Sequence, residues 1–334
     1  MTNNLIEVDD LVATFGGAKR LLAKPRPLVR AVDGVSFALE DGEILGLVGE
    51  SGCGKSTLAK TVLGLQTEAS GTITLDGKVV SGLAVQKARK TRSAIQYVHQ
   101  DAGAAFDPWW PIGRTLDETL KINGISDAAE RVTRSDAMLT AVGLDPSFKR
   151  RYPHELSGGQ QRRAGLARVL GLRPRIVILD EPTSGLDLSV QATVLRLIRD
   201  LRSEFGLTYL FISHDLSVVA RMCDRVAIMY LGRIVEIGPA PEIFASPRHP
   251  YTRALLEASP RLAAGQIDTM RVLTGDPPSP FARPAGCSFR SRCPNGDADC
   301  SQLAPKLEQI KGSTRKVACL HQDSLIPRKT ASAS

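Results

Sequence analysis

Short runs of apolar and β-branched residues recur along the chain, and segments with helical periodicity separate them. These runs predict strands over residues 43–48, 94–99, 175–179 and 207–213. An alternating stretch bounded by glycines predicts an antiparallel strand over 71–77. Residues 226–237, with Leu231-Gly232 at their centre, predict a hairpin. Strands that alternate with helices in this way are typical of an α/β fold with a largely parallel sheet.

Two regions depart from this alternation. Between about residues 107 and 170 the strand pattern disappears, so we expect an inserted helical subdomain there. From Pro239 onward Pro and Gly become more frequent, and residues 275–280 have the composition of a linker. We therefore place a boundary near residue 240. It separates a domain of residues 1–240 from a C-terminal module of residues 241–334, which carries cysteines over about 285–320 and ends in a flexible tail.

Composition and charge narrow the class of protein. The chain has 334 residues, of which 43% are hydrophobic, and no run of about 18 apolar residues that would predict a transmembrane helix. Its first ten residues are polar and do not resemble a secretory signal. The net charge of +8 comes from scattered basic residues without interleaved aromatics, so no nucleic-acid partner is expected. We expect a cytosolic protein that reaches a membrane only through partners.

A phosphate-binding loop is predicted directly after the strand over 43–48, before a helix over 55–65. The residues concerned are Gly49, Glu50, Ser51, Gly52, Cys53, Gly54, Lys55, Ser56 and Thr57, which fit the P-loop pattern G-x-x-x-x-G-K-S and its continuation. Backbone amides and the helix N-terminus would hold the phosphates, Lys55 would neutralise their charge, and Ser56 would offer a hydroxyl to Mg²⁺. The pattern predicts a site for ATP or a similar nucleotide.

A pair of acids follows the strand over 175–179. Asp180 is placed at the carboxyl edge of the predicted sheet, where it can hold Mg²⁺ through water. Glu181 comes next and could orient or deprotonate an attacking water. Together with the P-loop, these acids predict nucleotide hydrolysis.

The pentapeptide Leu156-Ser157-Gly158-Gly159-Gln160 lies between these two motifs. With this order of motifs, residues of about 5 to 240 resemble the ATP-binding cassette (ABC) ATPases. Four further positions match motifs of that family: Phe15 an adenine-stacking aromatic, Gln100 the Q-loop, Asp187 the D-loop and His214 the switch histidine. One departure is Gln161-Arg162, where the family more often has Arg-Gln.

The resemblance implies a P-loop core with an antiparallel β subdomain and a helical signature subdomain, and a working unit of two cassettes. It implies that Gln100 senses Mg²⁺ and the attacking water, and that His214 contacts the γ-phosphate and holds Glu181. It also implies that Ser157 and Gly159 face the nucleotide of the opposite cassette. Because Glu181 and His214 are both present, the chain is not expected to be an inactive half of such a pair.

Four of the six cysteines lie near the C-terminus, at Cys287, Cys293, Cys300 and Cys319, with the spacing C-x5-C-x6-C-x18-C. In a cytosolic chain this clustering favours a metal or cluster site over disulfides. Four thiolates can hold Zn²⁺ or an iron–sulfur cluster, and free thiols are the third alternative. The spacing lacks the C-x2-C knuckle of common zinc sites.

The segments His249-Pro250-Tyr251-Thr252-Arg253 and Cys287-Ser288-Phe289-Arg290-Ser291-Arg292-Cys293-Pro294 resemble the region after the cassette in oligopeptide, dipeptide and nickel importer ATPases. This resemblance implies a [4Fe-4S] cluster on the four cysteines. It also implies a membrane-associated translocase with a second ATPase subunit, two permeases and an extracytoplasmic substrate-binding protein, at the cytoplasmic face of the bacterial inner membrane. Peptides, nickel and oligosaccharides are the substrates that it suggests. The alternatives are a soluble ABC ATPase acting on nucleic acid or the ribosome, and an export ATPase.

Overall fold

The computed structural model describes residues 4–16, 28–83, 93–99, 103, 106–258, 275–279, 281 and 283–322. These residues form two compact units. Unit 1 comprises Met1–Ile6, Leu39–Ile44 and Leu75–Ile212, and unit 2 comprises Glu7–Ala38, Leu45–Thr74 and Ser213–Ser334. Among the described residues no helix is long and apolar enough to cross a bilayer.

Unit 1 contains a parallel sheet in the order β8-β7-β6, formed by β6 (Ile95–Val98), β7 (Ile176–Asp180) and β8 (Thr208–Ile212). The register pairs Tyr97 with Ile178 and Ile178 with Leu210. Every residue of β7 and β8 is buried, which explains why their sequences are mostly apolar, with the polar Asp180 at the end of β7 and Thr208 at the start of β8. The short strand β5 (Lys78–Val79) also belongs to this unit.

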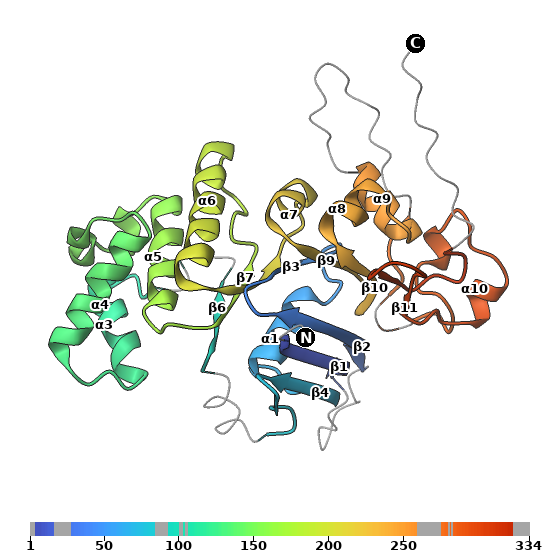
Figure 1. Ribbon diagram of the computed structural model, residues 1–334, viewed down its shortest axis with the longest axis horizontal. Helices are drawn as coiled ribbons and strands as arrows, with labels where there is room; N and C mark the ends of the chain where they lie inside the picture. The colour runs from blue at the N-terminus through green and yellow to red at the C-terminus, as the bar shows by residue number, and fades with distance from the viewer. Residues whose placement is uncertain are drawn as a thin grey trace, which may run out of the picture. The chain divides into compact units, whose positions relative to one another are not determined.

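The helical part of unit 1 contains α3 (Ile112–Ile122), α4 (Ala128–Ala141) and α5 (Gly158–Leu170), with the 3₁₀ turns η2 (Pro146–Arg150) and η3 (Pro153–Glu155) between the last two. Helices α3, α4 and α5 pack against one another, and α5 also packs against α6 (Leu188–Phe205) (Figure 1). Residues 106–170 hold no strand among their described positions, as the helical periodicity predicted.

Unit 2 contains a mixed sheet. Strand β3 (Ile44–Val48) runs parallel to β9 (Arg225–Tyr230), which forms an antiparallel hairpin with β10 (Arg233–Pro239). The turn uses positive φ at Leu231 and Gly232, which fits a primed hairpin turn. Two short C-terminal strands, β12 (Lys316–Val317) and β11 (Glu308–Gln309), extend the sheet beyond β10.

A buried ion pair fastens β12 to the rest of unit 2. The carboxylate of Glu236, in β10, has no exposed surface and accepts a hydrogen bond from Arg315, which directly precedes β12. It also accepts from the backbone N–H groups of Arg248 and His249, at 3.0 and 2.9 Å. A buried charge is tolerated only when it is paired and hydrogen-bonded in this way.

Most residues of the remaining strands and helices also belong to unit 2. Strands β2 (Val29–Glu40), β1 (Asn4–Phe15) and β4 (Ser70–Leu75) follow one another in a second sheet, and α1 (Lys55–Leu63) follows the P-loop. Later elements are α7 (Leu216–Met222), α8 (Ala240–Ala245), α9 (Pro250–Ala258), η4 (Arg290–Arg292) and α10 (Asp299–Gln302). Helix α8 packs against β9 and β10, as Figure 1 shows.

The strands expected near residues 43, 71, 94, 175, 207 and 226 are all present, and β7 and β8 pair in parallel as expected. Helix α1 begins at Lys55 as predicted but ends at Leu63, because Gly64 takes a left-handed cap conformation with φ of 80°. The chain therefore has an α/β fold with mixed and antiparallel sheets.

Candidate functional site

The P-loop follows β3 as a turn that only glycine can form at several positions. Gly52 and Gly54 have φ of 77° and 110°, where side chains are rarely tolerated. A Cβ on Gly49 would lie 2.1 Å from the carbonyl oxygen of Met229, and one on Gly54 would lie 2.2 Å from that of Ala31. The glycines let the loop fit tightly against the neighbouring backbone.

Lys55 is held inside this loop. Its side chain is buried, and its Nζ donates to the carbonyl oxygens of Gly49 at 2.7 Å and Glu50 at 3.0 Å. Both of these carbonyl groups are neutral, so the loop positions the ammonium, which can still form an ion pair with a phosphate. Ser56 and Thr57 follow in the first turn of α1, and both are half-buried.

Asp180 lies at the end of β7 with 5% of its surface exposed. The hydroxyl of Tyr97, on the neighbouring strand β6, donates a hydrogen bond to its Oδ2. Burial and this hydrogen bond to Asp180 raise the pKa of Tyr97 well above its usual value, so the hydroxyl keeps its proton and remains a donor. Tyr97 was not predicted as a site residue from the sequence.

Glu181 adopts a left-handed backbone conformation with φ of 49°, which is uncommon for a residue with a side chain. Three backbone contacts hold it in unit 1. Its N–H donates to Ile212 at 2.9 Å, and its carbonyl accepts from the N–H of Ser184 at 3.1 Å and from Nη1 of Arg162 at 3.1 Å. Arg162 is buried in α5 and also donates to the carbonyl of Ser184 at 2.6 Å, so it links the signature helix to the turn after β7.

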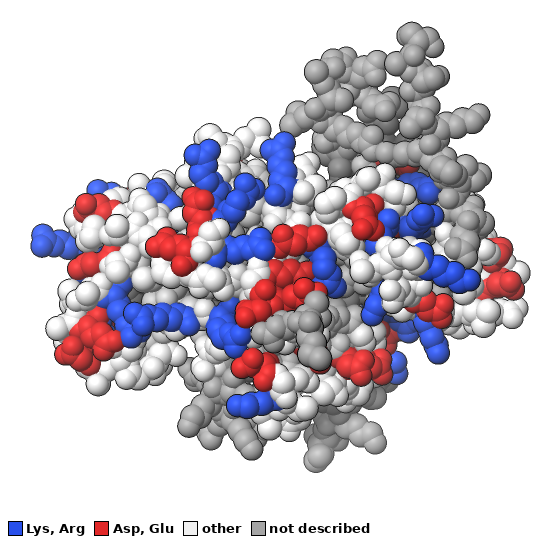
Figure 2. Space-filling model, viewed as in Figure 1, with Lys and Arg blue, Asp and Glu red and all other residues white. Residues whose placement is uncertain are grey.

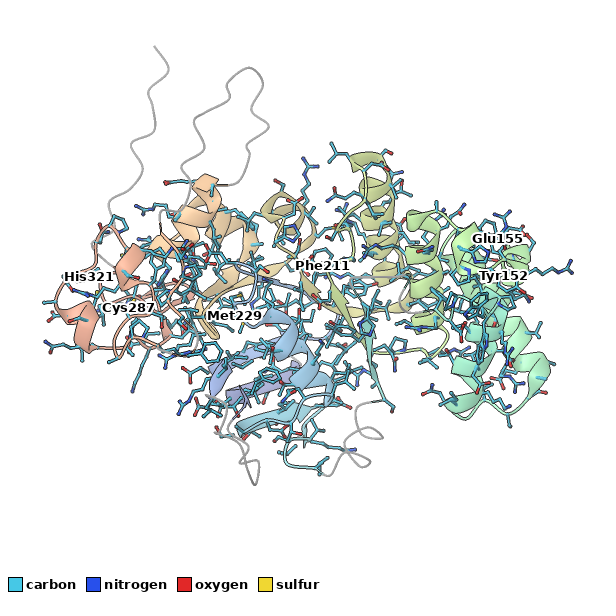
Figure 3. The ribbon with its side chains drawn as sticks, turned by 180° about the vertical axis from the view of Figure 1, so that it is seen from behind. Tyr152, Glu155, Phe211, Met229, Cys287 and His321 are labelled. Carbon is cyan, nitrogen blue, oxygen red and sulfur yellow. The ribbon has the colours of Figure 1, made fainter. Side chains whose placement is uncertain are left out.

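The signature pentapeptide forms the start of α5. Ser157 and Gln160 cap it reciprocally: Ser157 Oγ accepts from the Gln160 N–H at 3.3 Å, and Gln160 Oε1 accepts from the Ser157 N–H at 3.0 Å. Gly159 is buried where a Cβ would come within 2.6 Å of Val190. Ser157 and Gly158 are exposed, so this end of the helix is accessible within the described chain. Figure 3 labels Tyr152 and Glu155 in the turn just before it.

The remaining predicted residues have varied surroundings. Asp187 caps α6 by accepting from the N–H groups of Ser189 and Val190, at 3.0 and 2.9 Å. Phe15, at the end of β1, is 43% exposed, and His214, just after β8, is also exposed. Gln100 lies outside the described residues. Unit 2 thus carries Phe15, the P-loop and His214, and unit 1 carries the signature, Asp180, Glu181 and Asp187.

The four C-terminal cysteines come together in unit 2. Cys287, Cys293, Cys300 and Cys319 all line one small cavity of about 20 Å³, and none forms a disulfide. Burial raises the pKa of all four thiols, and that of Cys319 to about 11. Such thiols remain protonated at neutral pH unless a cation binds them. Figure 3 shows Cys287 and His321 in this region.

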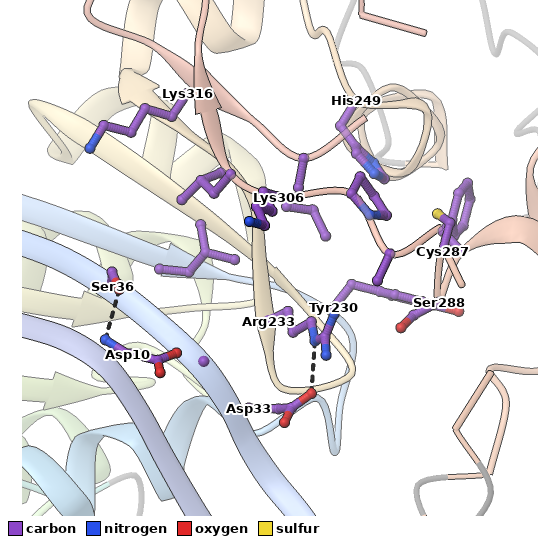
Figure 4. A pocket seen from close by; sticks show the side chains of 18 of the residues that line it. Asp10, Asp33, Ser36, Tyr230, Arg233, His249, Cys287, Ser288, Lys306 and Lys316 are labelled. Atoms are coloured by element: carbon purple, nitrogen blue, oxygen red, sulfur yellow. Dashed lines mark hydrogen bonds and ion pairs between the residues drawn. The ribbon is translucent and has the colours of Figure 1, made fainter. Parts of the chain in front are cut away.

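A second hollow borders the same module. An open groove of about 750 Å³ is lined by residues of β1, β2, β9, β10 and the C-terminal segment, among them Cys287 (Figure 4). At one end Asp33 accepts from Arg233 Nε and from Arg283 Nη1, both at 2.7 Å. Elsewhere, basic and acidic side chains are interspersed over the face shown in Figure 2, which displays no large single-sign patch among its described residues.

Comparison with known proteins agrees with these motifs. The ABC transporter family matches residues 32–184, and the C-terminal region of oligopeptide/dipeptide transporters matches residues 235–300. The chain is 43% identical over 328 residues to the oligopeptide transport ATP-binding protein OppF of Escherichia coli (strain K12), covering 96% of this chain and 97% of OppF. The chain belongs to the oligopeptide/dipeptide ABC transporter ATPases.

Two further similarities describe this ABC ATPase. It is 42% identical over 307 residues to the di/tripeptide transport ATP-binding protein DppF of Pseudomonas aeruginosa (strain UCBPP-PA14), covering 92% of this chain and 94% of DppF. Its structure resembles the dimeric post-hydrolysis state of the ATP-binding cassette MJ0796 bound to ADP and Pi. That match has a TM-score of 0.61 and 25% identity, and covers 70% of this chain and 98% of MJ0796. The expected ATPase family is confirmed, and so is the expected α/β P-loop fold of the cassette.

Sequence reasoning missed several residues that contact the motifs of this ABC ATPase. Arg162 lies two positions after the signature, and this closeness to the motif was its signal in the sequence. Tyr251 and Arg292 lie in the two C-terminal segments that carried the family resemblance, yet both contact Glu50 of the P-loop. Contacts across about 200 or more residues of sequence leave no local pattern in a single chain.

Proposed function

We propose that this ABC importer ATPase hydrolyses ATP to drive the uptake of peptides. The observation that carries the proposal is the complete set of ATPase motifs in a chain that also matches the oligopeptide/dipeptide transporter C-terminal region over residues 235–300. OppF and DppF are named for oligopeptide and di/tripeptide transport, which favours a peptide as the substrate. Nickel and oligosaccharides are the other substrates that we infer from the family resemblance.

The proposed chemistry assigns one task to each residue. Lys55 and the amides of the P-loop bind the phosphates, and Phe15, which is exposed, stacks on the adenine. Glu181 is the general base for the attacking water, while His214 contacts the γ-phosphate and Gln100 senses the water. Ser56 and Asp180 would hold Mg²⁺, with Gln100 as a further ligand. The oxygen donors on Asp180 and Ser56 suit this ion, which stabilises charge on the phosphates.

The proposed assembly pairs this chain with a second cassette, identical or paralogous. Ser157, Gly158, Gly159 and Gln160, with Asp187, would then contact the nucleotide held by the opposite cassette. The dimeric form of MJ0796 with ADP and Pi supports a paired working unit. We further propose two permease subunits and an extracytoplasmic binding protein, with this chain at the cytoplasmic face of the inner membrane. Residues 1–240 would form the nucleotide-binding domain, with its helical subdomain at about 107–170, and 241–334 the C-terminal module.

The C-terminal module is proposed to hold a [4Fe-4S] cluster on Cys287, Cys293, Cys300 and Cys319. The donor set fits, since four thiols line one cavity. Tetrahedral zinc would need its sulfurs about 3.8 Å apart, given the usual Zn–S distance. Among the described side chains, however, the group whose ligand atoms lie within 4.8 Å of one another is Asp297, Cys300 and His321, not the four thiols. Four thiolates are the usual ligand set of a [4Fe-4S] cluster, and the resemblance to the importer ATPases favours this group over zinc.

Peptide uptake can be tested directly. The complex would be purified with its natural subunits, which are then identified, and reconstituted into vesicles with labelled peptides, nickel or oligosaccharides. We expect ATP-dependent peptide uptake that Glu181→Gln abolishes. Uptake of another solute, or none with any permease partner, would contradict the proposal.

The cluster requires a separate experiment. Anaerobic purification should give coloured protein with about four irons per chain by iron and sulfide assay. Cys293→Ser should lower the iron content, whereas Cys223→Ser, at a buried cysteine outside the cavity, should not. Colourless, iron-free protein with four freely reacting thiols would contradict the assignment, and bound zinc would support the alternative.

A further inference from the structure

Glu50, the second residue of the P-loop pattern, forms a two-pronged ion pair with a residue of the cysteine segment. Nη1 of Arg292 lies 2.8 Å from Oε2 of Glu50, and Nη2 lies 2.8 Å from Oε1. The Arg292 side chain is 4% exposed and that of Glu50 26% exposed, so the pair is largely shielded from water. Arg292 ends η4 and directly precedes Cys293. Bidentate pairs of this geometry are among the strongest charged contacts in proteins.

A second contact reaches the same P-loop residue. The N–H of Glu50 donates to the hydroxyl of Tyr251, in α9, at 2.9 Å. The carbonyl of Glu50 accepts from Lys55 Nζ at 3.0 Å. Elements after residue 249 therefore contact Glu50 through its carboxylate and its N–H, and Glu50 in turn contacts the P-loop lysine through its carbonyl.

A buried aromatic cluster supports both contacts. The rings of Tyr230 and Tyr251 have centroids 4.6 Å apart, and each lies 5.4 Å from the ring of Phe289. Phe289 is 1% exposed and lies between Cys287 and Cys293 in the sequence. The cysteine segment is thus packed against the residues that contact Glu50, all of them within unit 2.

We propose that Arg292 is a positioning residue for ATP, which acts through Glu50 and makes the affinity of the P-loop depend on the cysteine segment. A glycine-rich loop loses conformational entropy when it closes on phosphates. Fixing Glu50 in advance removes part of that cost and keeps Lys55 in place. The inference rests on the proposed function, because it takes ATP as the ligand of the P-loop. Binding coupled in this way is reciprocal, so ATP also stabilises the arrangement of the cysteine segment.

The first experiment compares Arg292→Ala and Arg292→Lys in the purified full chain and its complex. We expect Arg292→Ala to raise the Kd of fluorescent ATP and the KM for ATP about tenfold, while kcat stays within about twofold, since the contact acts on binding. Arg292→Lys should recover part of the affinity, because an ammonium keeps the charge but not the bidentate geometry.

The matched control is Arg290→Ala in the same turn. Arg290 Nε donates to the carbonyl of Asp297 at 3.0 Å, inside the cysteine module and away from Glu50. We expect this variant to keep the wild-type KM. If Arg290→Ala and Arg292→Ala raise KM equally, the effect reflects general disturbance of the module, and the proposal is overturned.

A second variant separates the predicted effect on ATP binding from a folding defect of Arg292→Ala. Glu50→Gln keeps the size of the side chain and leaves Arg292 intact, so it should raise KM as Arg292→Ala does. The double variant should add little to either single change, because both remove one interaction. ATP should also slow amide hydrogen exchange over residues 290–293 in wild type but not in Arg292→Ala. Wild type that fails to bind ATP would refute the proposed function, whereas equal ATP binding by wild type and Arg292→Ala would refute only this inference.

Discussion

At the scale of single residues, a buried carboxylate depends on the donors that reach it. The Tyr97 hydroxyl is such a donor for Asp180, and its raised pKa keeps it protonated over the physiological range. Hydrogen bonds to charged groups contribute about 1.5–3 kcal/mol, roughly twice the value for neutral pairs. The contact also fixes the rotamer of the carboxylate proposed to hold Mg²⁺.

Tyr97→Phe should therefore lower the free energy of unfolding by about 1.5–3 kcal/mol, measured by urea denaturation. The control is Tyr209→Phe, another buried tyrosine of unit 1, whose hydroxyl donates to the neutral carbonyl of Ile198 at 3.2 Å. That change should cost only about 1 kcal/mol. Equal losses in the two variants would mean that the Asp180 contact has no special strength.

At the scale of elements, Arg162 joins α5 to the turn after β7. Its guanidinium donates to the carbonyls of both Glu181 and Ser184, at 3.1 and 2.6 Å. We expect Arg162→Lys to lower the kcat of ATP hydrolysis about tenfold, equivalent to about 1.4 kcal/mol in the barrier, because one ammonium cannot hold both carbonyls. Steady-state ATPase kinetics measure this.

The neighbouring residue supplies the control for that prediction. Arg163 lies one position further along α5 and donates to the carbonyl of Gly143 at 2.9 Å, away from Glu181. Arg163→Lys should change kcat by less than about twofold. A similar loss in both variants would show that α5 tolerates no lysine here, and the assigned role of Arg162 would be wrong.

A second element-scale prediction concerns Asp33 in β2. Burial acts to raise its pKa, but hydrogen bonds and charges from Arg233, Arg283 and Arg30 outweigh it and lower the pKa below the usual value. The carboxylate therefore stabilises the fold at pH values above about 4, and this stabilisation is lost as the pH falls through the lowered pKa. It connects β2 to β10 and to the segment at residue 283.

The pH dependence of this stabilisation can be tested by comparing the thermal unfolding of Asp33→Asn with that of wild type. The difference in Tm should be full at pH 7 and pH 5 and should shrink below about pH 4, as the wild-type carboxylate takes up its proton. The control is Asp76→Asn, whose exposed carboxylate pairs with Arg175 at 3.2 Å and should contribute little. A Tm difference that stays constant down to pH 3 would contradict the assignment.

Sequence patterns predicted elements whose signals are local. The hairpin at 226–237 and the strand–loop–helix around the P-loop follow from runs and turns within a dozen residues, and both are confirmed. Strands β1 and β2 were not predicted; neither forms a continuous apolar run, because β1 contains Glu7, Asp9 and Asp10 and β2 contains Arg30 and Asp33. The acid Glu236 in buried β10 is explained by partners remote in the sequence: the N–H groups of Arg248 and His249, and the guanidinium of Arg315, which lies 79 positions further along.

The same distinction between local and long-range features holds for the candidate site. Motif residues such as Lys55 and Glu181 were predicted from spacing, because phosphate binding and hydrolysis require fixed residue types in a fixed order. The residues that hydrogen-bond to these motifs were not predicted, because Tyr97, Tyr251 and Arg292 lie in other elements of the fold. The left-handed backbone of Glu181 likewise has no sequence signature, since it depends on contacts of the surrounding turn.

At the scale of the whole molecule, the exposed N-terminus of α5 is the feature that bears on the proposed pairing of two cassettes. Ser157 and Gly158 are exposed although the pentapeptide is the most specific motif in the chain. A helix N-terminus with a close-packed glycine attracts anions. The proposed pairing explains this exposure, because the motif would be covered only when a second cassette brings its nucleotide to it.

We therefore expect ATP to drive pairing when hydrolysis is blocked. In the Glu181→Gln background, ATP with Mg²⁺ should double the mass of this chain, or join it to the second ATPase of its complex, as measured by light scattering after size exclusion. ADP with Mg²⁺ should not cause this pairing.

Adding Ser157→Arg should abolish the ATP-driven pairing, because a long cation at the exposed cap would occupy the space of the opposing phosphate. Ser203→Arg, at an exposed serine of α6 whose hydroxyl donates to the carbonyl oxygen of Arg199 at 3.3 Å, should leave pairing intact. Pairing that persists in Ser157→Arg would show that the signature lies outside the interface, and the role proposed for it across the pair would have to be abandoned.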